Sequence, residues 1–257
     1  MLNVGLSPVW LVAFLLGMAR SVAWVYTAPP FSNSSVPGPV KMALSLALTM
    51  AVLPKLMTQA VSIDTSTKGL VLAVGGQVLV GAGLGFLVRV ILSAIEMAGD
   101  LLDVNGGLSL ASAFDPLAMN QNAVLAKLNS AVGTTLLLVS GLHLVVLAGY
   151  WRTFDLLPVN QTLDLARYSS VLTVGITQLV ATALQIAGPL LAVLFVADVS
   201  LGVMSRISPQ LQPFALSFPI KIGIVLMGGG LLMTTLPQVV QMLVERVLSA
   251  MGTVLGV

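Results

Sequence analysis

Six long apolar stretches, separated by short polar segments, make up most of the chain. They lie at about residues 8–28, 39–57, 69–95, 123–151, 171–199 and 219–247. A helix needs about 20 apolar residues to cross a hydrocarbon core about 30 Å thick, and each stretch comes close to or exceeds that length. The pattern predicts an all-α, polytopic membrane-associated protein with broken and tilted helices that pair in hairpins.

The region from Leu70 to Pro116 differs from an ordinary membrane span, because its second half is charged. If Leu70–Val104 is one helix, it is about 50 Å long at about 1.5 Å per residue. Such a helix either tilts strongly or lies partly outside the lipid. Its charged side chains recur at helical spacing and are predicted to share one face: Arg89, Glu96, Asp100 and Asp103.

A glycine-rich break follows this charged helix. Asn105-Gly106-Gly107 interrupts the helical pattern, and small apolar residues then continue to Asp115-Pro116. A charged face that leads into a small apolar segment is expected to pack against other protein around a constriction.

Composition supports a membrane location and excludes several functions. The 257 residues are 57% hydrophobic and only 8% charged, whereas soluble domains have about 25% charged residues. The net charge is only +2 and its cations are scattered, so nucleic acid is not an expected partner. The absence of cysteine excludes disulfides, thiolate metal sites and cysteine nucleophiles. The first apolar stretch lacks a basic leader region and is expected to be retained.

Polar side chains inside the apolar stretches predict contacts with protein rather than with lipid. Arg20 and Arg89 are expected to have buried partners, whereas Lys127 and Asp198 lie near helix ends and are expected to snorkel. Two polar lines at helical spacing predict an assembly hairpin: Gln178, Thr182 and Gln185 in the fifth stretch, and Gln238, Gln241 and Glu245 in the sixth.

Two candidate motifs have simpler structural interpretations. Gly81 and Gly85 do not complete a nucleotide-binding fingerprint, because Phe86 stands where a third glycine is needed. Their spacing of four predicts close helix approach instead. His143 is the only histidine and lies among Leu and Val residues. It is expected to be a packed or interface residue, and no metal site or cofactor is predicted.

Three motifs occur in the order found in one protein family. They are Gly107-Leu108-Ser109-Leu110-Ala111 with Asp115-Pro116 in the centre, Arg20 followed by Pro29-Pro30-Phe31 and Val36-Pro37-Gly38-Pro39-Val40-Lys41 near the start, and Leu201 to Gln210 with Phe218-Pro219-Ile220-Lys221 near the end. Together they resemble the FliR family, the export-gate subunits of flagellar type III protein export. The resemblance spans nearly the whole chain.

The resemblance implies a structural and gating subunit of a protein-export channel, with no enzymatic activity. It implies that residues 1–170 resemble a P subunit and contain a plug loop at about 105–117. It also implies that residues 171–257 form a helical hairpin that resembles a Q subunit. The implied partners are FliP-like, FliQ-like and FlhB-like subunits, unfolded flagellar proteins as the substrate, and the lipid bilayer. The implied location is the bacterial inner membrane at the flagellar basal body.

The same resemblance assigns roles to individual residues. The pore plug loop comprises Gly106, Gly107, Leu108, Ser109, Leu110, Ala113, Phe114, Asp115 and Pro116. The subunit-interface charges are Arg20, Arg89, Glu96, Asp100 and Asp103, and the hairpin interface comprises Gln178, Gln185, Arg206, Phe218, Pro219, Lys221, Gln241 and Glu245. The chain departs from the family at Leu110 and Ala113, where aromatic residues are frequent, which predicts a smaller plug.

Three alternatives stay open at this point. An injectisome export-gate subunit would share the architecture, although Asp115-Pro116 favours the flagellar branch. A small-solute secondary transporter would also carry intramembrane charges and broken helices, but it calls for an internal repeat and a polar midplane site, which the sequence does not show. An intramembrane enzyme would need a nucleophile or metal constellation, and none is apparent.

Overall fold

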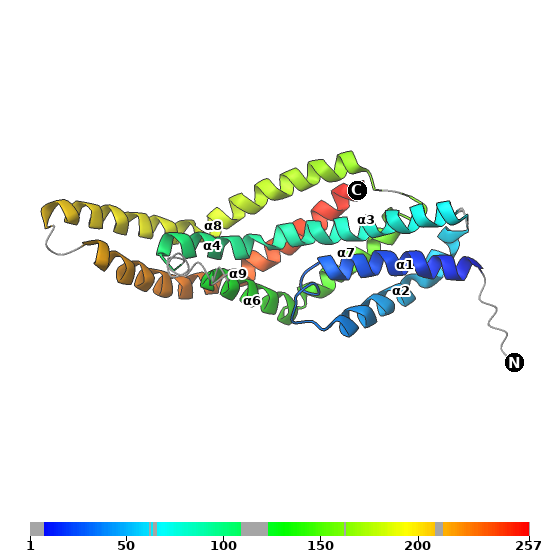
Figure 1. Ribbon diagram of the computed structural model, residues 1–257, viewed down its shortest axis with the longest axis horizontal. Helices are drawn as coiled ribbons and strands as arrows, with labels where there is room; N and C mark the ends of the chain where they lie inside the picture. Colours follow the sequence, from blue (N-terminus) through cyan, green and yellow to red (C-terminus); the bar gives the residue numbers. More distant parts are fainter. Residues whose placement is uncertain are drawn as a thin grey trace. The chain divides into compact units, whose positions relative to one another are not determined.

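The computed structural model describes residues 8–61, 63, 66–108, 123–161, 163–208 and 213–256 (Figure 1). These residues form eight helices and no strand. The helices are α1 (Pro8–Thr27), α2 (Gly38–Ala60), α3 (Thr67–Leu92), α4 (Ala94–Gly106), α6 (Val124–Val139), α7 (Leu142–Leu156), α8 (Leu165–Ile207) and α9 (Pro213–Leu255). The predicted all-α class is confirmed.

Five of these helices are long and apolar enough to cross a membrane by themselves: α1, α2, α3, α8 and α9. The pair α6 and α7 would make a sixth span if it is taken as one broken segment. The described helices therefore account for all six apolar stretches, and the chain is a polytopic membrane protein.

Two expected continuous helices are interrupted. The predicted helix over Leu70–Val104 divides at Ser93, whose ψ of −7° loosens the turn between α3 and α4. The Ser93 carbonyl accepts a hydrogen bond from the Met97 amide, which is the first bond of α4. The fourth apolar stretch divides at Gly141, whose φ of 74° is a left-handed conformation that an L side chain disfavours. Local backbone geometry thus shortens both segments.

The longest helices are α8 and α9, each with 43 residues. At about 1.5 Å per residue, each has a contour length of about 65 Å, twice the thickness of a hydrocarbon core. Both helices contain prolines without being divided by them, Pro189 in α8 and Pro219 and Pro237 in α9. The helix expected to be longer than a membrane span was the one in the third apolar stretch, but that stretch divides into α3 and α4. The helices that exceed a span in length are α8 and α9.

The chain divides into two compact units that do not follow the order of the sequence. Unit 1 contains residues 1–91, 137–176 and 243–257, and unit 2 contains residues 92–136 and 177–242. Both units thus combine segments from the first and last parts of the chain. The division at residue 170, which the resemblance implies, concerns likeness to other subunits and stays a prediction.

In unit 1, glycines bring α1 close to two neighbouring helices. A Cβ atom added at Gly81 of α3 would overlap the Arg20 carbonyl oxygen of α1, and one at Gly85 would overlap the Thr27 hydroxyl. On α1 itself, a Cβ atom at Gly17 would lie 2.5 Å from Leu56 of α2. The predicted role of Gly81 and Gly85 in close helix approach is confirmed.

In unit 2, α4 packs against α6, α8 and α9 through one apolar core. Its members come from all four helices: Ala98, Leu102, Leu125, Ala183, Ile186, Ala187, Leu190, Leu194 and Val225. Gly106 at the end of α4 lies against Val225, where a Cβ atom would come within 2.6 Å of the valine methyl group. This core fixes the position of the short helix α4, which precedes the predicted plug loop.

Replacing Gly81 by Ala should destabilise unit 1, because the new methyl group meets the backbone of α1 rather than a flexible side chain. Overpacking of this kind costs about 1–3 kcal/mol. Gly75→Ala is the matched control on α3, since nothing lies within 4 Å of its added Cβ atom and Ala favours a helix by about 1 kcal/mol over Gly. Thermal unfolding of both variants in detergent measures the difference, and equal midpoints would contradict the close packing.

Candidate functional site

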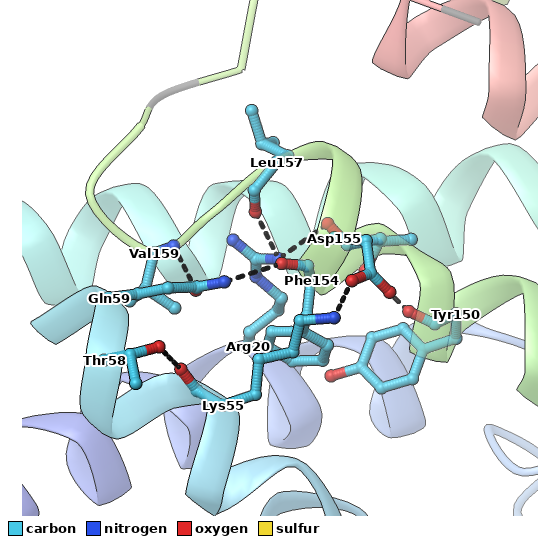
Figure 2. Close-up of polar contacts among 10 residues, drawn as sticks. Arg20, Lys55, Thr58, Gln59, Tyr150, Phe154, Asp155, Leu157 and Val159 are labelled. Atoms are coloured by element: carbon cyan, nitrogen blue, oxygen red, sulfur yellow. Dashed lines mark hydrogen bonds and ion pairs between the residues drawn. The ribbon is translucent and has the colours of Figure 1, made fainter.

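Arg20 is fully buried in unit 1 and lies beside the end of α7 (Figure 2). Its Nε donates a hydrogen bond to Gln77 Oε1 at 2.7 Å, and its Nη1 donates to the Leu157 carbonyl at 2.9 Å and more weakly to the Thr153 carbonyl at 3.4 Å. The guanidinium also lies 4.5 Å from the centre of the Phe154 ring, a cation–π geometry. Arg20 therefore links α1 to both α3 and α7.

Two glutamines complete this polar cluster around the end of α7. Gln77 of α3 donates to the Val159 carbonyl at 2.9 Å. Gln59 of α2 donates to the Phe154 carbonyl at 3.0 Å and accepts a hydrogen bond from the Val159 amide at 3.2 Å. Figure 2 shows Gln59 facing both groups. Side chains from three helices thus satisfy backbone groups that the end of a helix leaves unpaired.

Within the described residues, no carboxylate pairs with the Arg20 guanidinium. Its charge is balanced instead by the carbonyl groups at the C-terminus of α7, which is the negative end of that helix dipole. A separate ion pair between Lys55 and Asp155 joins α2 to the same helix end, with both side chains partly exposed. The end of α7 is therefore held by one buried cation and one surface ion pair.

Aromatic side chains extend the cluster along α1 and α7. Trp24 stacks on Tyr150 with ring centres 4.4 Å apart, and Tyr150 meets Phe154 edge to face at 5.4 Å. The Tyr150 hydroxyl shares a 3.0 Å hydrogen bond with Ser21, which also accepts one from Thr49 of α2. Polar groups and rings together make this part of unit 1 densely connected.

The structure separates the four charges predicted to share a face. Arg89, Glu96 and Asp100 are exposed and have no ion-pair partner among the described residues, whereas Asp103 is only 1% exposed. Burial and the nearby Asp103 charge both raise the pKa of Asp100. The start of α6 covers Asp103 on α4. Arg89 was expected to have a buried partner, but its side chain is exposed.

Only the beginning of the predicted plug loop lies within the described residues. Gly106 ends α4, and Gly107 adopts a left-handed conformation with φ of 79°, followed by Leu108. This geometry is the usual glycine C-cap. The other predicted plug residues lie outside the described part of the chain: Ser109, Leu110, Ala113, Phe114, Asp115 and Pro116.

The predicted hairpin residues lie mostly on the outside of α8 and α9. The exposed members are Gln178, Gln185, Arg206, Pro219, Gln241 and Glu245. Phe218 and Lys221 are half-buried, and Lys221 forms an ion pair with Asp198 across the hairpin. Asp198 was expected to snorkel, but it pairs with the neighbouring helix instead.

Sequence reasoning did not identify the polar residues that gather around Arg20 and the end of α7. Gln59, Gln77 and Tyr150 come from three separate stretches, and nothing in the local pattern connects them with residue 20. Their only signal was that each is a polar group inside or beside an apolar stretch. His143, which was expected to be packed or at an interface, is half-buried with its Nδ1 3.3 Å from the Leu137 carbonyl.

Comparison with known proteins identifies the family. The family described as "Bacterial export proteins, family 1" matches residues 11–247. The chain belongs to this family. It is 31% identical to the flagellar biosynthetic protein FliR of Escherichia coli over 223 residues, which cover 86% of this chain and 84% of the relative. It is 28% identical to FliR of Pectobacterium carotovorum over 253 residues, or 96% and 94% of the two chains.

A relative from a secretion system is also similar. The secretion system apparatus protein SsaT of Salmonella typhimurium is 25% identical over 224 residues, which cover 85% of each chain. The predicted resemblance to an export subunit is therefore confirmed. This member of the export family is a helical membrane protein in which Arg20 is the centre of a buried polar cluster in unit 1.

Replacing Arg20 by Met should destabilise unit 1, because the Leu157 carbonyl and the Gln77 side chain lose a charged donor. Hydrogen bonds to charged groups contribute about 1.5–3 kcal/mol each. Arg20→Lys should recover only part of the loss, since an ammonium cannot reproduce the planar fork of donors. Arg152→Met is the control, because Arg152 is exposed on α7 and surface changes stay within about 0.5 kcal/mol. Equal unfolding midpoints for Arg20→Met and Arg152→Met would contradict this role.

Proposed function

We propose that this chain is a structural and gating subunit of the flagellar type III protein-export channel, which works without catalysing a reaction. Membership of the bacterial export family and similarity to flagellar FliR proteins support the assignment. The structural observation that carries it is α4, a short helix that is packed on one side, exposes Glu96 and Asp100 on the other, and ends in a glycine cap.

The exposed polar side chains support assembly with other subunits. Glu96 and Asp100 have no cation partner within the described residues, and partial burial and the nearby Asp103 charge raise the pKa of Asp100. Gln178 and Gln185 likewise face outward from an apolar helix. Such groups are stabilised by contact with another protein helix or with water rather than with lipid.

The partners that fit are the FliP-like, FliQ-like and FlhB-like subunits of an export gate. The substrate would be unfolded flagellar protein, and the location would be the inner membrane at the flagellar basal body. Arg20 is a weaker candidate for such contacts than Glu96 or Asp100, because it is buried against its own chain.

The segment that begins at Gly106 is proposed as the pore plug. Its residues from Gly106 to Phe114 are small or apolar apart from the Ser109 and Ser112 hydroxyl groups. A ring of apolar groups closes a narrow pore by excluding water, and glycines allow the backbone to change conformation. The C-cap at Gly107 provides a fixed point at which the segment leaves α4.

Similarity to SsaT favours one further candidate, an export-gate subunit of an injectisome. The identity of 25% to that protein is below the 31% to Escherichia coli FliR, so the flagellar assignment is preferred. Complementation separates the two: the chain should restore motility to a bacterium that lacks its FliR protein. Failure to restore motility, together with restored effector secretion in a strain lacking SsaT, would reverse the preference.

Deleting Ser109–Phe114 should make the closed export complex permeable to small solutes, because the proposed apolar seal is removed while the cap at Gly107 is kept. Solute efflux from vesicles that contain the purified complex measures this. A second variant replaces the same six residues by six Gly and Ser residues, which keep the length of the segment but lack its apolar side chains. It should leak as well, which would show that the loss of apolar groups, and not the shorter segment, opens the complex. Unchanged permeability in both variants would contradict the plug.

Reversing the charge at Glu96 or Asp100 should weaken assembly, because a contact with a cation or a hydrogen-bond donor of a partner becomes repulsive. Like-charge juxtaposition at an interface costs several kcal/mol. Co-purification with the FliP-like and FliQ-like subunits measures the loss. Lys68→Glu is the control, because Lys68 is also exposed but lies at the start of α3. Wild-type yields for Glu96→Lys and Asp100→Lys would contradict the interface.

A further inference from the structure

Asp103 makes hydrogen bonds at both ends of the connection between α4 and α6. Its backbone carbonyl accepts from the amides of Gly107 and Leu108, the latter at 3.1 Å, and so closes the C-terminus of α4. Its side-chain Oδ1 accepts from the Leu125 amide at 3.1 Å, and Oδ2 accepts from the Ala126 amide at 3.0 Å. These two amides belong to the first turn of α6, so one residue ends one helix and begins the next.

Glycine allows α6 to come close enough for this contact. Gly99 lies one helical turn before Asp103, and a Cβ atom added there would lie 2.5 Å from the Ala126 Cα and 2.6 Å from the Ala126 nitrogen. Both Gly99 and Asp103 are buried. The first turn of α6 therefore rests directly on the backbone of α4 at Gly99, and the carboxylate of Asp103 receives its amides.

We propose that Asp103 is the positioning residue of the connection between α4 and α6, and that its carboxylate group holds the start of α6 beside the end of α4. Amides in the first turn of a helix have no partner within the helix, and a carboxylate there also interacts favourably with the helix dipole. The exposed fraction of 1% makes water a poor substitute for it. The hydrogen bonds of Asp103 do not depend on the proposed function. Only the expected effect on permeability rests on it, because the segment between α4 and α6 is the proposed plug.

The geometry requires two acceptors on one side chain. In an aspartate, each carboxylate oxygen receives one amide. An asparagine of the same shape offers one acceptor oxygen and one NH2 group, and the NH2 group cannot accept a hydrogen bond. Asp103→Asn therefore removes one of the two bonds and the charge, with almost no change in volume.

The test measures hydrogen exchange and permeability on the same assembled complex. In Asp103→Asn, peptides covering the first turn of α6 should exchange about tenfold faster or more, as expected for a lost buried cap. Vesicles containing this complex should also leak solute. Unchanged exchange would overturn the positioning role of Asp103, and faster exchange without leakage would overturn its link to the seal.

The chain contains a matched control in Asp164, which caps the start of α8. Asp164 accepts from the amides of Ala166 and Arg167 at 3.0 and 3.2 Å, but it is exposed. Both amides bond to the same oxygen, Oδ1, which an asparagine would keep, so the control variant is Asp164→Ala. Asp164→Ala should speed exchange at the start of α8 and leave the vesicles tight. Leakage from this variant as well would show that loss of any helix cap opens the complex, which would overturn the specific role of Asp103.

Two further measurements distinguish failure of the positioning role of Asp103 from failure of the proposed plug. If Asp103→Asn does not assemble, hydrogen exchange of the purified chain by itself in detergent tests the same contact. Faster exchange in the first turn of α6 is again expected, and unchanged exchange would overturn the positioning role. The complex lacking Ser109–Phe114 tests the plug itself. A tight deletion complex with faster exchange in Asp103→Asn would reject the plug and retain the positioning role.

Discussion

The end of a helix inside an apolar protein leaves carbonyl groups that neither lipid nor apolar side chains can satisfy. In unit 1 this constraint is met at the C-terminus of α7, where Arg20, Gln59 and Gln77 bring donors from three other helices. The buried positive charge needs no carboxylate there, because the carbonyl groups of the helix end balance it. The packing of α1, α2 and α3 around α7 depends on this set of hydrogen bonds, and the glycine contacts between α1 and α3 bring the helices close enough to form it.

Unit 2 meets the same constraint at the start of α6, with a carboxylate in place of a guanidinium. Here a buried Asp103 receives the free amides of the first turn, and Gly99 again supplies the space for close approach. The two units thus follow one rule with opposite charges: a cation at a carbonyl end and an anion at an amide end. The buried side chains of Arg20, Gln77 and Asp103 satisfy backbone groups of other segments, whereas Glu96 and Gln185 face outward.

This division of polar groups agrees with membership of a bacterial export family. A subunit of a protein-export channel needs a rigid body and an outer surface that recognises other subunits. The buried clusters supply rigidity through hydrogen bonds between helices, and the exposed charges of α3 and α4 remain available for partners. The short helix α4 combines both features, because its core residues anchor it while its exposed carboxylates point away from the core.

The sequence by itself determined the all-α class, the number of apolar segments, the glycine contact at Gly81 and Gly85, and the family resemblance, because each follows from hydrophobic spacing or from local motifs. It did not determine which polar residues meet. Arg20 and Leu157 are 137 positions apart, and no local pattern connects them. The burial of Asp103 beside exposed Asp100 was also beyond the sequence, because the two lie almost on one face and only the approach of α6 separates them. The pairing of polar groups and the burial of Asp103 depend on the tertiary structure, because a polar group in an apolar chain bonds to whichever partner the packing brings near.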